Sequence, residues 1–355
     1  MKMKMKMKMM MFVICACVLA GKSSGLLGFK CSQRSSCQSL VGYKTPNATS
    51  IFHLMNLFHL SDSNSILAAN NLPSSTPSNY TIQPLDIVNI PIPCRCSNGS
   101  GVSDGVPIYR VQKDDGLFWI ANYVYMGLVT YQQIQEANGI QDPNLILVGD
   151  RLSIPLPCSC DSDHIVSAQR VIHYAHIVED GTTVESIAHN FGTPTDVLYN
   201  LNGISNNSQL IAQTVFDVPL KACNSWVSST SADYPLLVPN GTYVFTANSC
   251  VKCKCNAANN WTLECEPSGL PPAANSSWST CPSMLCDQTT LSLSNTTTTS
   301  GCNTSTCSYS GFSNQTIMTT LSTCPASDNY GTTISLSWKY MLIALHLVML
   351  IVYPL

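Results

Sequence analysis

The chain has 355 residues, of which only 10% are charged, with 17 Lys and Arg against 20 Asp and Glu. Five of the 17 cations lie in terminal segments that we expect to be removed, so the remaining chain is acidic and has no basic patch. Such a surface argues against nucleic acid and anionic lipid headgroups as partners.

Residues 1–20 have the layout of a secretory signal peptide. A lysine-rich start is followed by an apolar run of about ten residues and by small residues around Ala20, a pattern too short for a membrane span. We expect this segment to be cleaved on secretion. A retained signal anchor is the alternative.

Three stretches of the chain predict the same order of elements: strand, helix, helix, strand. The middle stretch, residues 107–160, shows it most clearly. Apolar residues recur at i, i+3, i+4 and i+7 over residues 117–124, which is the spacing of one helix face. A second helix ends at Asn138-Gly139, a pair that tolerates a left-handed cap, and a strand closes the stretch.

Residues 31–96 and 171–223 repeat this order, the first stretch more loosely than the second. In the later stretch, Val178, Gly181 and Val184 match the first strand and helix of the middle one, and DVLYNLNGI matches QQIQEANGI. Each of the three stretches places an asparagine at the end of its second helix: Asn70, Asn138 and Asn202. Agreement at so many positions indicates an internal repeat.

The cysteines predict disulfides. Cys15 and Cys17 leave with the signal peptide, so 16 of the 18 cysteines remain, an even number in a secreted chain. Residues 94–96 and 158–160 are Cys-x-Cys doublets, each at the end of a Pro-x-Pro-Cys-x-Cys sequence. The two cysteines of a doublet point to one face of a strand and cannot easily pair with each other. We therefore expect the doublets to staple the repeats together.

Residues 224–286 predict a small cysteine-rich module, and residues 287–329 a glycosylated Ser/Thr-rich stalk. Zinc binding by Cys250, Cys253, Cys255 and Cys265 is the alternative to disulfides in the module, but we expect no metal and no cofactor. Ten N-x-S/T sequons predict a heavily glycosylated surface. These sequons are at Asn47, Asn79, Asn98, Asn206, Asn240, Asn260, Asn275, Asn295, Asn303 and Asn314.

Only residues 224–330 leave room for a catalytic domain, and their acidic residues are few: Asp233, Glu264, Glu266, Asp287 and Asp328. Glycoside hydrolysis needs two positioned carboxylates, whereas Glu264 and Glu266 flank a cysteine in a stretch that predicts solvated surface. The sequence contains no GxSxG or HExxH pattern, and its seven histidines are scattered. We expect no enzymatic activity and no catalytic residues.

Residues 330–355 predict a propeptide for attachment of a glycosylphosphatidylinositol (GPI) anchor. Small residues around Ser327 and Asn329, the two candidate attachment points, precede a polar spacer and an apolar tail that runs to the last residue. The tail is shorter than the ~20 apolar residues of a spanning helix. A short membrane span is the alternative.

The stretch YRVQKDDGLFWIA, with LVTYQQIQEANGI and DPNLILVGDRLSIPLPCSC, resembles a LysM module. The whole chain resembles the plant LysM domain-containing GPI-anchored proteins, which are close to chitin elicitor-binding and peptidoglycan-binding receptors. The resemblance implies an α+β fold with three βααβ LysM modules, at residues 31–96 (degenerate), 107–160 and 171–223. It also implies the disulfides Cys31–Cys96, Cys37–Cys160 and Cys94–Cys158. Residue 114 departs from the family, because LysM modules usually carry glycine where this chain has Asp114.

The resemblance further implies that two loops of the middle module bind glycans that contain N-acetylglucosamine. The candidate contacts are Gln112, Lys113, Asp114, Asp115, Gly116, Leu117, Phe118, Gln141, Asp142, Pro143, Asn144, Leu145, Ile146 and Leu147. Turn backbones would hydrogen-bond the N-acetyl amide, and Pro143, Leu145 or Leu117 would take its methyl group. The alternative is that the Asp and Asn residues of these loops only form turns.

Loops 179–184 and 205–211 of the last module are a second candidate site, although a glycan at Asn206 would block it.

The function implied by the resemblance is a cell-surface receptor for peptidoglycan or chitin in innate immunity. We expect a transmembrane LysM receptor kinase as the signalling partner, and homo- or hetero-oligomers with related LysM proteins. The alternative function is a structural wall-associated glycoprotein.

Overall fold

The structure is a computed structural model. It describes residues 28–32, 35–161, 166, 169–223, 225–274, 276–287, 289–299 and 303–324. The predicted signal peptide, Asn275, both candidate lipid attachment residues and the segment 330–355 lie outside the described residues. Within those ranges no helix has both the length and the apolar character to cross a membrane.

The first βααβ unit begins and ends with long strands. Strand β2 (Ser35–Lys44) pairs antiparallel with β5 (Ile87–Ser97) along its whole length. Between them lie β3 (Thr49–Ser50), α2 (Ile51–Phe58), α3 (Asn64–Ala69) and β4 (Thr81–Ile82). Helix α2 starts at Ser50 because the Ser50 hydroxyl accepts a hydrogen bond from the N–H of His53.

The middle unit is built on two short strands, β7 (Ile108–Arg110) and β8 (Arg151–Ser153). Its helices are α4 (Leu117–Trp119), which continues as the π-helical turn η1 (Ile120–Val124), and α5 (Tyr131–Ala137). A capping box starts α5, in which the side chains of Thr130 and Gln133 each accept a hydrogen bond from the other residue's backbone N–H.

The last unit runs from β9 (Val171–Ile177) through α6 (Val184–Phe191) and α7 (Thr195–Asn202) to β10 (Val215–Cys223), with a short 3₁₀ turn, η2 (Asn207–Gln209), before β10. Gly192 and Gly203 end the two helices in the left-handed conformation.

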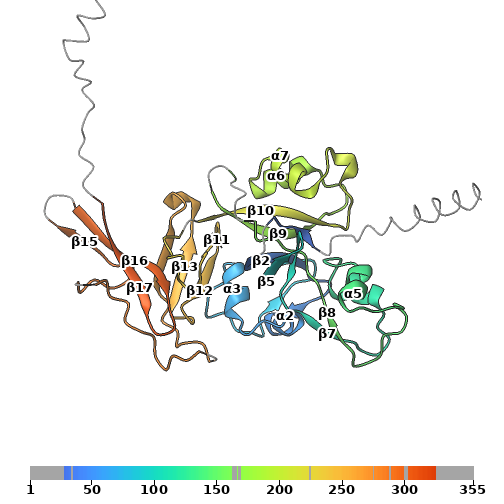
Figure 1. The fold of residues 1–355 in the computed structure, drawn as a ribbon, viewed down its shortest axis with the longest axis horizontal. Coiled ribbons are helices and arrows are strands. Elements are labelled where there is room, and N and C mark those ends of the chain that lie inside the picture. Colours follow the sequence, from blue (N-terminus) through green and yellow to red (C-terminus); the bar gives the residue numbers. More distant parts are fainter. Residues whose placement is uncertain are drawn as a thin grey trace, which may run out of the picture.

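The first and last units share one sheet, which the repeat pattern did not predict. Its strand order is β1-β6-β5-β2-β9-β10-β11, where β1 is Phe29–Lys30, β6 is Ser100–Ser103 and β11 is Val238–Pro239 (Figure 1). The units join where β2 runs parallel to β9, with Leu40 beside Tyr174 and Val41 beside Ala175. The middle unit keeps its own two-stranded sheet.

The first and middle units are instead joined through their core. Phe58 and Tyr125, each with no exposed surface, meet edge to face with ring centroids 5.9 Å apart, and Tyr43 packs on Phe58 at 5.2 Å. The helices of the last unit bury a separate cluster around Tyr174, Ile187 and Leu198. Each βααβ unit alone would bury little surface, so sharing a core or a sheet supplies the missing burial.

Three disulfides stabilise the first two units, and they join the same cysteines that the family resemblance implied. Cys31 bonds to Cys96 within the first unit. Cys37 bonds to Cys160, and Cys94 bonds to Cys158, so each links the first unit to the end of the middle one. Both Cys-x-Cys doublets therefore act as staples between different parts of the chain.

The repeated asparagine fastens the second helix of each unit to its closing strand. The Asn138 side-chain amide donates to the carbonyl of Ser153 and accepts from the Ser153 N–H, both at 2.8 Å. Asn70 and Asn202 make the same pair of hydrogen bonds in their own units, at 2.7–2.9 Å. Only an amide side chain can donate and accept in this way, which explains the recurrence of asparagine.

Replacing Asn138 with aspartate should therefore lower the free energy of unfolding by about 1–3 kcal/mol. A carboxylate loses the donor and turns an oxygen toward the Ser153 and Ile134 carbonyls that the amide now reaches. Thermal unfolding of the secreted protein measures the effect. Gln132→Glu, which adds the same charge at an exposed position of the same helix, is the matched control, and an equal loss in both variants would contradict the explanation.

The C-terminal part contains two three-stranded sheets (Figure 1). The first consists of β12 (Tyr243–Thr246), β13 (Val251–Cys255) and β14 (Leu263–Pro267), and the second of β15 (Thr296–Thr299), β16 (Asn303–Phe312) and β17 (Ile317–Cys324). Its disulfides are Cys223–Cys255, Cys250–Cys281, Cys253–Cys265 and Cys286–Cys307. The four cysteines considered as zinc ligands are all in disulfides, so the zinc alternative is wrong.

The prediction of a stalk from residue 287 does not fit the described residues up to Cys324. Tyr309 and Ile317 are buried and share a hydrophobic cluster with Val227 and Val251 of the cysteine-rich module. The Tyr309 hydroxyl also donates to Asp233 at 2.7 Å. The abundant Ser and Thr suggested a solvated stalk, but the few apolar side chains between them are spaced to fill one face of a sheet.

Candidate functional site

The two candidate loops of the middle unit lie side by side at one end of the β7–β8 pair. The N–H of Val111 donates to the carbonyl of Asp150, and the N–H of Gly149 donates back to the carbonyl of Val111, both at 2.9 Å. These bonds hold the start of loop 112–118 against the end of loop 141–147. The strands thus bring together residues that are about 30 positions apart in the chain.

Loop 112–118 turns at Asp114, which has a φ of +68°. Gly181 holds the matching position of the last unit with a φ of +77°, so the loop keeps its geometry despite the aspartate, at modest cost. The Asp115 carboxylate accepts from the N–H of Gln112 at 2.7 Å and from the hydroxyl of Tyr109 at 2.8 Å. Burial and this carboxylate together raise the pKa of Tyr109.

Loop 141–147 is held by two further carboxylates. Asp142 accepts from the backbone N–H of Asn144 at 2.9 Å and from its side-chain amide at 3.0 Å. Asp150 accepts from the N–H of Leu147 at 2.8 Å. Asp115 and Asp142 therefore form turns, as the alternative to direct binding supposed, and their contribution to a site would be to shape the loop backbone.

The structure divides the candidate contacts by exposure. Leu117 is 2% exposed and belongs to the core, so its predicted contact with an N-acetyl methyl group is wrong. Half-buried candidates are Asp115, Gly116, Pro143 and Ile146. Exposed candidates are Gln112, Lys113, Asp114, Phe118, Gln141, Asp142, Asn144, Leu145 and Leu147. Leu145, Leu147 and Phe118, at 73%, 68% and 60% exposed, are the apolar candidates available to a ligand.

The sequence analysis missed three exposed apolar residues beside these loops. Val148 follows directly on loop 141–147 and is 69% exposed. Trp119 and Tyr123 are about half exposed and stack on each other with ring centroids 4.3 Å apart. Their i, i+4 spacing on the helix face opposite the apolar one was the available signal, but the prediction used that helix only for its buried face.

The two loops of the second candidate site, in the last unit, are tied together by a side chain. Asn207 accepts from the N–H of Val184 at 2.7 Å and donates to Glu185 at 2.7 Å, which ties loop 205–211 to the start of α6. Val184 is fully buried, and the sequon residue Asn206 is exposed. Both loops stay mostly exposed, so the feature that sets this site apart from the middle unit is the sequon at Asn206.

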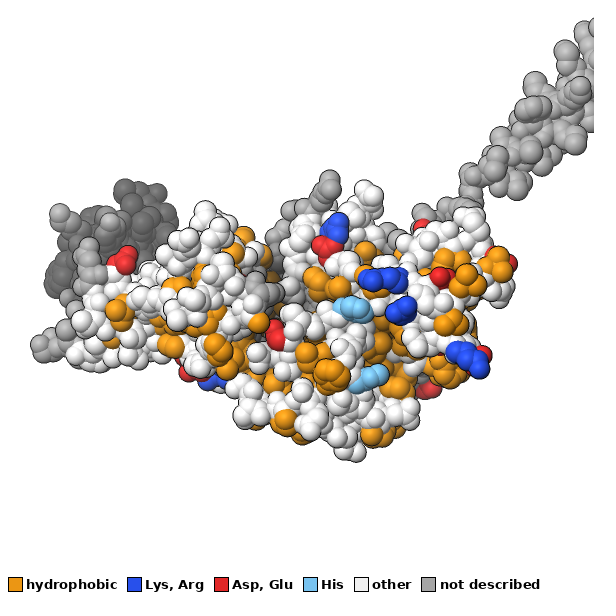
Figure 2. Space-filling view, turned by 90° about the horizontal axis from the view of Figure 1, so that it is seen from below, with side chains coloured by type: hydrophobic (Ala, Val, Ile, Leu, Met, Phe, Trp, Pro, Cys, Tyr) orange, Lys and Arg blue, Asp and Glu red, His pale blue; other side chains and the backbone are white. Residues whose placement is uncertain are grey.

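The glycosylation sequons distinguish the three units. Asn47 and Asn79 are exposed in the loops of the first unit, and Asn206 in those of the last unit. Between Asn98 and Asn206 the sequence contains no sequon, so no N-linked glycan would be attached to the middle unit itself. On the face shown in Figure 2, Lys and Arg side chains are scattered among hydrophobic and neutral groups and form no continuous basic patch.

Comparison with known proteins matches two parts of the chain to families. Residues 108–156 match the model of the LYK3/4/5 LysM2 domain, and residues 176–219 match the model of the LysM domain. These ranges coincide with the middle and last βααβ units. An ectodomain of a receptor-like kinase, solved by crystallography, is similar with a TM-score of 0.44 and 22% identity, covering 53% of this chain and 94% of that one.

Two curated plant proteins are similar along most of their length. The LysM domain-containing GPI-anchored protein 2 of Arabidopsis thaliana is 46% identical, and the similarity covers 91% of each chain. The chitin elicitor-binding protein of Oryza sativa subsp. japonica is 38% identical, again over 91% of each chain. The chain thus belongs to the family of plant LysM domain-containing GPI-anchored proteins.

Proposed function

We propose that this protein is a cell-surface receptor that binds N-acetylglucosamine-containing microbial glycans, peptidoglycan or chitin, through loops 112–118 and 141–147. The observation that carries the proposal is the exposed, sequon-free end of the middle unit. There, two adjacent loops combine tight turns of backbone with the exposed side chains of Leu145 and Leu147. A relative of similar length is named as a chitin elicitor-binding protein.

The chemistry of the ligand suits these loops. An N-acetylglucosamine unit is neutral and offers a carbonyl acceptor, an amide donor and a methyl group. Backbone N–H and carbonyl groups of the turns would pair with the amide, and Leu145 or Leu147 would cover the methyl group. A neutral sugar needs no charged clamp, which agrees with the scarcity of Lys and Arg.

The family places the protein on the extracellular face of the plasma membrane, where a GPI lipid would hold it. A protein anchored in this way has no cytosolic part, so a transmembrane LysM receptor kinase would supply the intracellular step. Co-purification from membranes treated with chitin oligomers or muropeptides should recover such a kinase. Its consistent absence from elicited membranes would overturn this part of the proposal.

A structural wall-associated glycoprotein is the competing function. Saturable, micromolar binding of short soluble oligomers would favour the receptor. Binding confined to insoluble polymer would favour the structural wall-associated glycoprotein. The two relatives that match most of this chain are named as a GPI-anchored protein and an elicitor-binding protein, which supports a role without catalysis.

Replacing Asp142–Leu145 with a Gly/Ser loop should weaken glycan binding at least about tenfold, a loss of about 1.4 kcal/mol or more. The change removes the Asp142 turn and the Leu145 side chain together. Calorimetric titration of the secreted protein with chitin oligomers and soluble muropeptides would measure it. The same replacement at Ser74–Pro77, an exposed loop of the first unit, is the control. Equal affinity in both variants would place binding elsewhere, and no binding by the wild type would reject the proposed function.

A further inference from the structure

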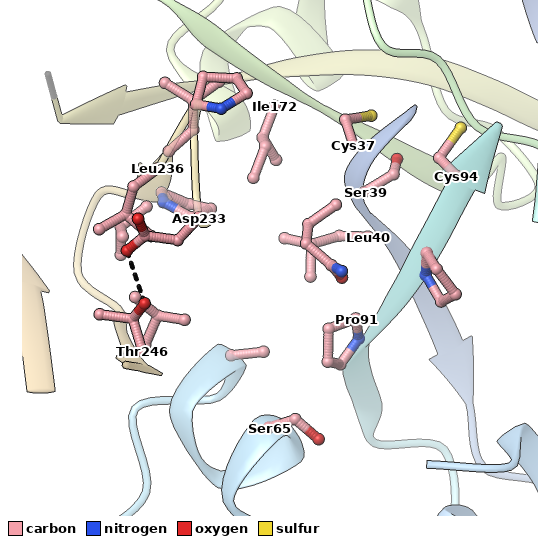
Figure 3. Close-up of a pocket in the computed structure, with 18 of the residues that line it drawn as sticks. Cys37, Ser39, Leu40, Ser65, Pro91, Cys94, Ile172, Asp233, Leu236 and Thr246 are labelled. Carbon is pink, nitrogen blue, oxygen red and sulfur yellow. Dashed lines mark hydrogen bonds between the residues drawn. The ribbon is translucent and has the colours of Figure 1, made fainter. Parts of the chain in front are cut away.

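A well-formed cavity in the described structure lies away from the candidate glycan loops. It has a volume of about 720 Å³ and opens between the shared sheet and the C-terminal part (Figure 3). Strands β2, β5 and β9 and helix α3 form one side, and residues 232–249 form the other. Its volume lies within the usual range for small-molecule sites, and no residue of loops 112–118 or 141–147 lines it.

The sheet side of the cavity is apolar because of the first Pro-x-Pro sequence. On β5, Ile92 is fully buried in the core, whereas the neighbouring Pro91 and Pro93 are half-buried and line the cavity. Leu40 of β2 and Ile172 of β9 continue this surface, and Figure 3 shows both around the cavity with Pro91. The prolines offer no N–H donor, so this wall favours an apolar molecular body.

Four carboxylates line the cavity, and no Lys or Arg is among the lining residues that the structure describes. The one basic lining residue, His173, is paired with the buried carboxylate of Asp217. The carboxylates belong to Asp62, Asp104, Asp161 and Asp233. Asp104 is paired with Arg95, and Asp161 accepts from the N–H of Ser32.

The other two carboxylates have only neutral donors among the described residues. Asp62 accepts from the N–H of Ser65 at 3.2 Å. Asp233, on the opposite side, accepts from the hydroxyls of Thr246 at 2.6 Å and Tyr309 at 2.7 Å, and from that of Ser231. A half-buried carboxylate without a counter-charge favours a nearby cation, and the cavity as a whole disfavours anions.

We propose that this cavity binds a cationic amphiphile, a small organic molecule with a protonated amine and an apolar body. The apolar body would lie on Pro91, Leu40 and Ile172, and the ammonium group would face Asp233, with the Asp62 carboxylate on the opposite wall adding to the negative potential. Because the cavity is walled by two parts of the chain, a bound molecule would also link the LysM units to the cysteine-rich module. This inference does not depend on the proposed glycan site.

Three probes with one body and different head groups test the proposal: 4-phenylbutylamine, 4-phenylbutanol and 4-phenylbutyrate. Their binding to the secreted, glycosylated protein would be measured by ligand-observed NMR titration at pH 6. The amine should bind saturably and at least about tenfold more tightly than the alcohol, and the carboxylate should not bind. Equal affinity of amine and alcohol, or no binding of the amine, would overturn the proposal.

Variants locate the site. Asp233→Asn should reduce amine affinity about tenfold, whereas Asp196→Asn, at an exposed residue of α7, should leave it unchanged. Since Asp233 also holds three hydroxyls, Ser65→Phe provides a second route by filling the cavity from α3. That variant should abolish amine binding while chitin-oligomer titration stays as in the wild type. Amine binding that survives Ser65→Phe would show that the amine binds at another place.

Discussion

Replacing Asp217 with asparagine is expected to lower the free energy of unfolding by about 3–5 kcal/mol. Asp217 and His173 are 3% and 2% exposed, and Nδ1 of His173 lies 2.8 and 2.9 Å from the two carboxylate oxygens. Nε2 of the same ring lies 3.2 Å from the carbonyl oxygen of Asp161. Both nitrogens thus face acceptors, which suits the doubly protonated ring. Removing Asp217 leaves a buried cation without its counter-charge.

The same pair predicts how stability depends on pH. Burial by itself lowers the pKa of His173, but the charge and hydrogen bond of Asp217 outweigh it, so the pKa is raised above its ordinary value. A raised folded pKa means that the pair stabilises the fold fully below the unfolded pKa of about 6.5. That contribution is lost as the pH rises through the folded pKa of His173.

In the Asp217→Asn variant the sign of this pH dependence should reverse. Burial would now lower the pKa of His173, so the unfolded chain would bind the proton more tightly, and stability would fall as the pH drops below about 6.5. Urea unfolding at a series of pH values between about 5 and 9 measures both slopes. Asp196→Asn is the control for loss of one exposed acidic group, and parallel curves for all three proteins would contradict the assignment.

Removing the Cys94–Cys158 disulfide by double substitution to alanine should cost about 3 kcal/mol by the chain-entropy relation. The two cysteines are 64 residues apart and buried at the contact of the first two units, but Cys31–Cys96 and Cys37–Cys160 already connect them through about ten residues, and that shorter loop sets the entropy. The loss would appear as a drop in the midpoint of thermal unfolding, with mass spectrometry confirming that the other bonds remain.

The Cys253–Cys265 bond supplies a matched comparison. It closes 12 residues between the paired strands β13 and β14, a loop about as long as the one that Cys94–Cys158 closes when the other disulfides remain, so its removal should cost a similar amount. Losses that differ by more than about 1 kcal/mol would show that loop length does not govern the stabilisation here.

The order of elements within each repeat could be predicted because it is encoded locally. The spacing of residues 117–124 and the asparagines at the ends of the second helices depend on neighbours within one unit. The parallel contact of Leu40 with Tyr174 could not be predicted in this way, because no local pattern records which distant strand lies beside β2. For the same reason the sequence analysis treated the units as separate modules.

The candidate site shows a similar division. That loops 112–118 and 141–147 lie next to each other followed from the pairing of the strands beside them. Leu117 was assigned both to the buried face of a helix and to contact with the ligand. Its burial shows that only the assignment to the helix face is correct. Asp115 and Asp142 were ambiguous because turn-forming and binding residues share one chemistry. The exposed pair Trp119 and Tyr123 was overlooked, since helix periodicity reports what is buried and not what a surface recognises.

The long-range disulfide that starts on β2 also has a consequence for how this protein matures in the secretory pathway. Cys37 on β2 is synthesised 123 residues before its partner Cys160, which corresponds to a delay on the order of ten seconds at ordinary translation rates. During that interval the edge of β2 and a reactive thiol are exposed to the lumen, where an incorrect early disulfide can form. Efficient maturation of such a chain should therefore depend on disulfide isomerase and on chaperones that cover open strand edges.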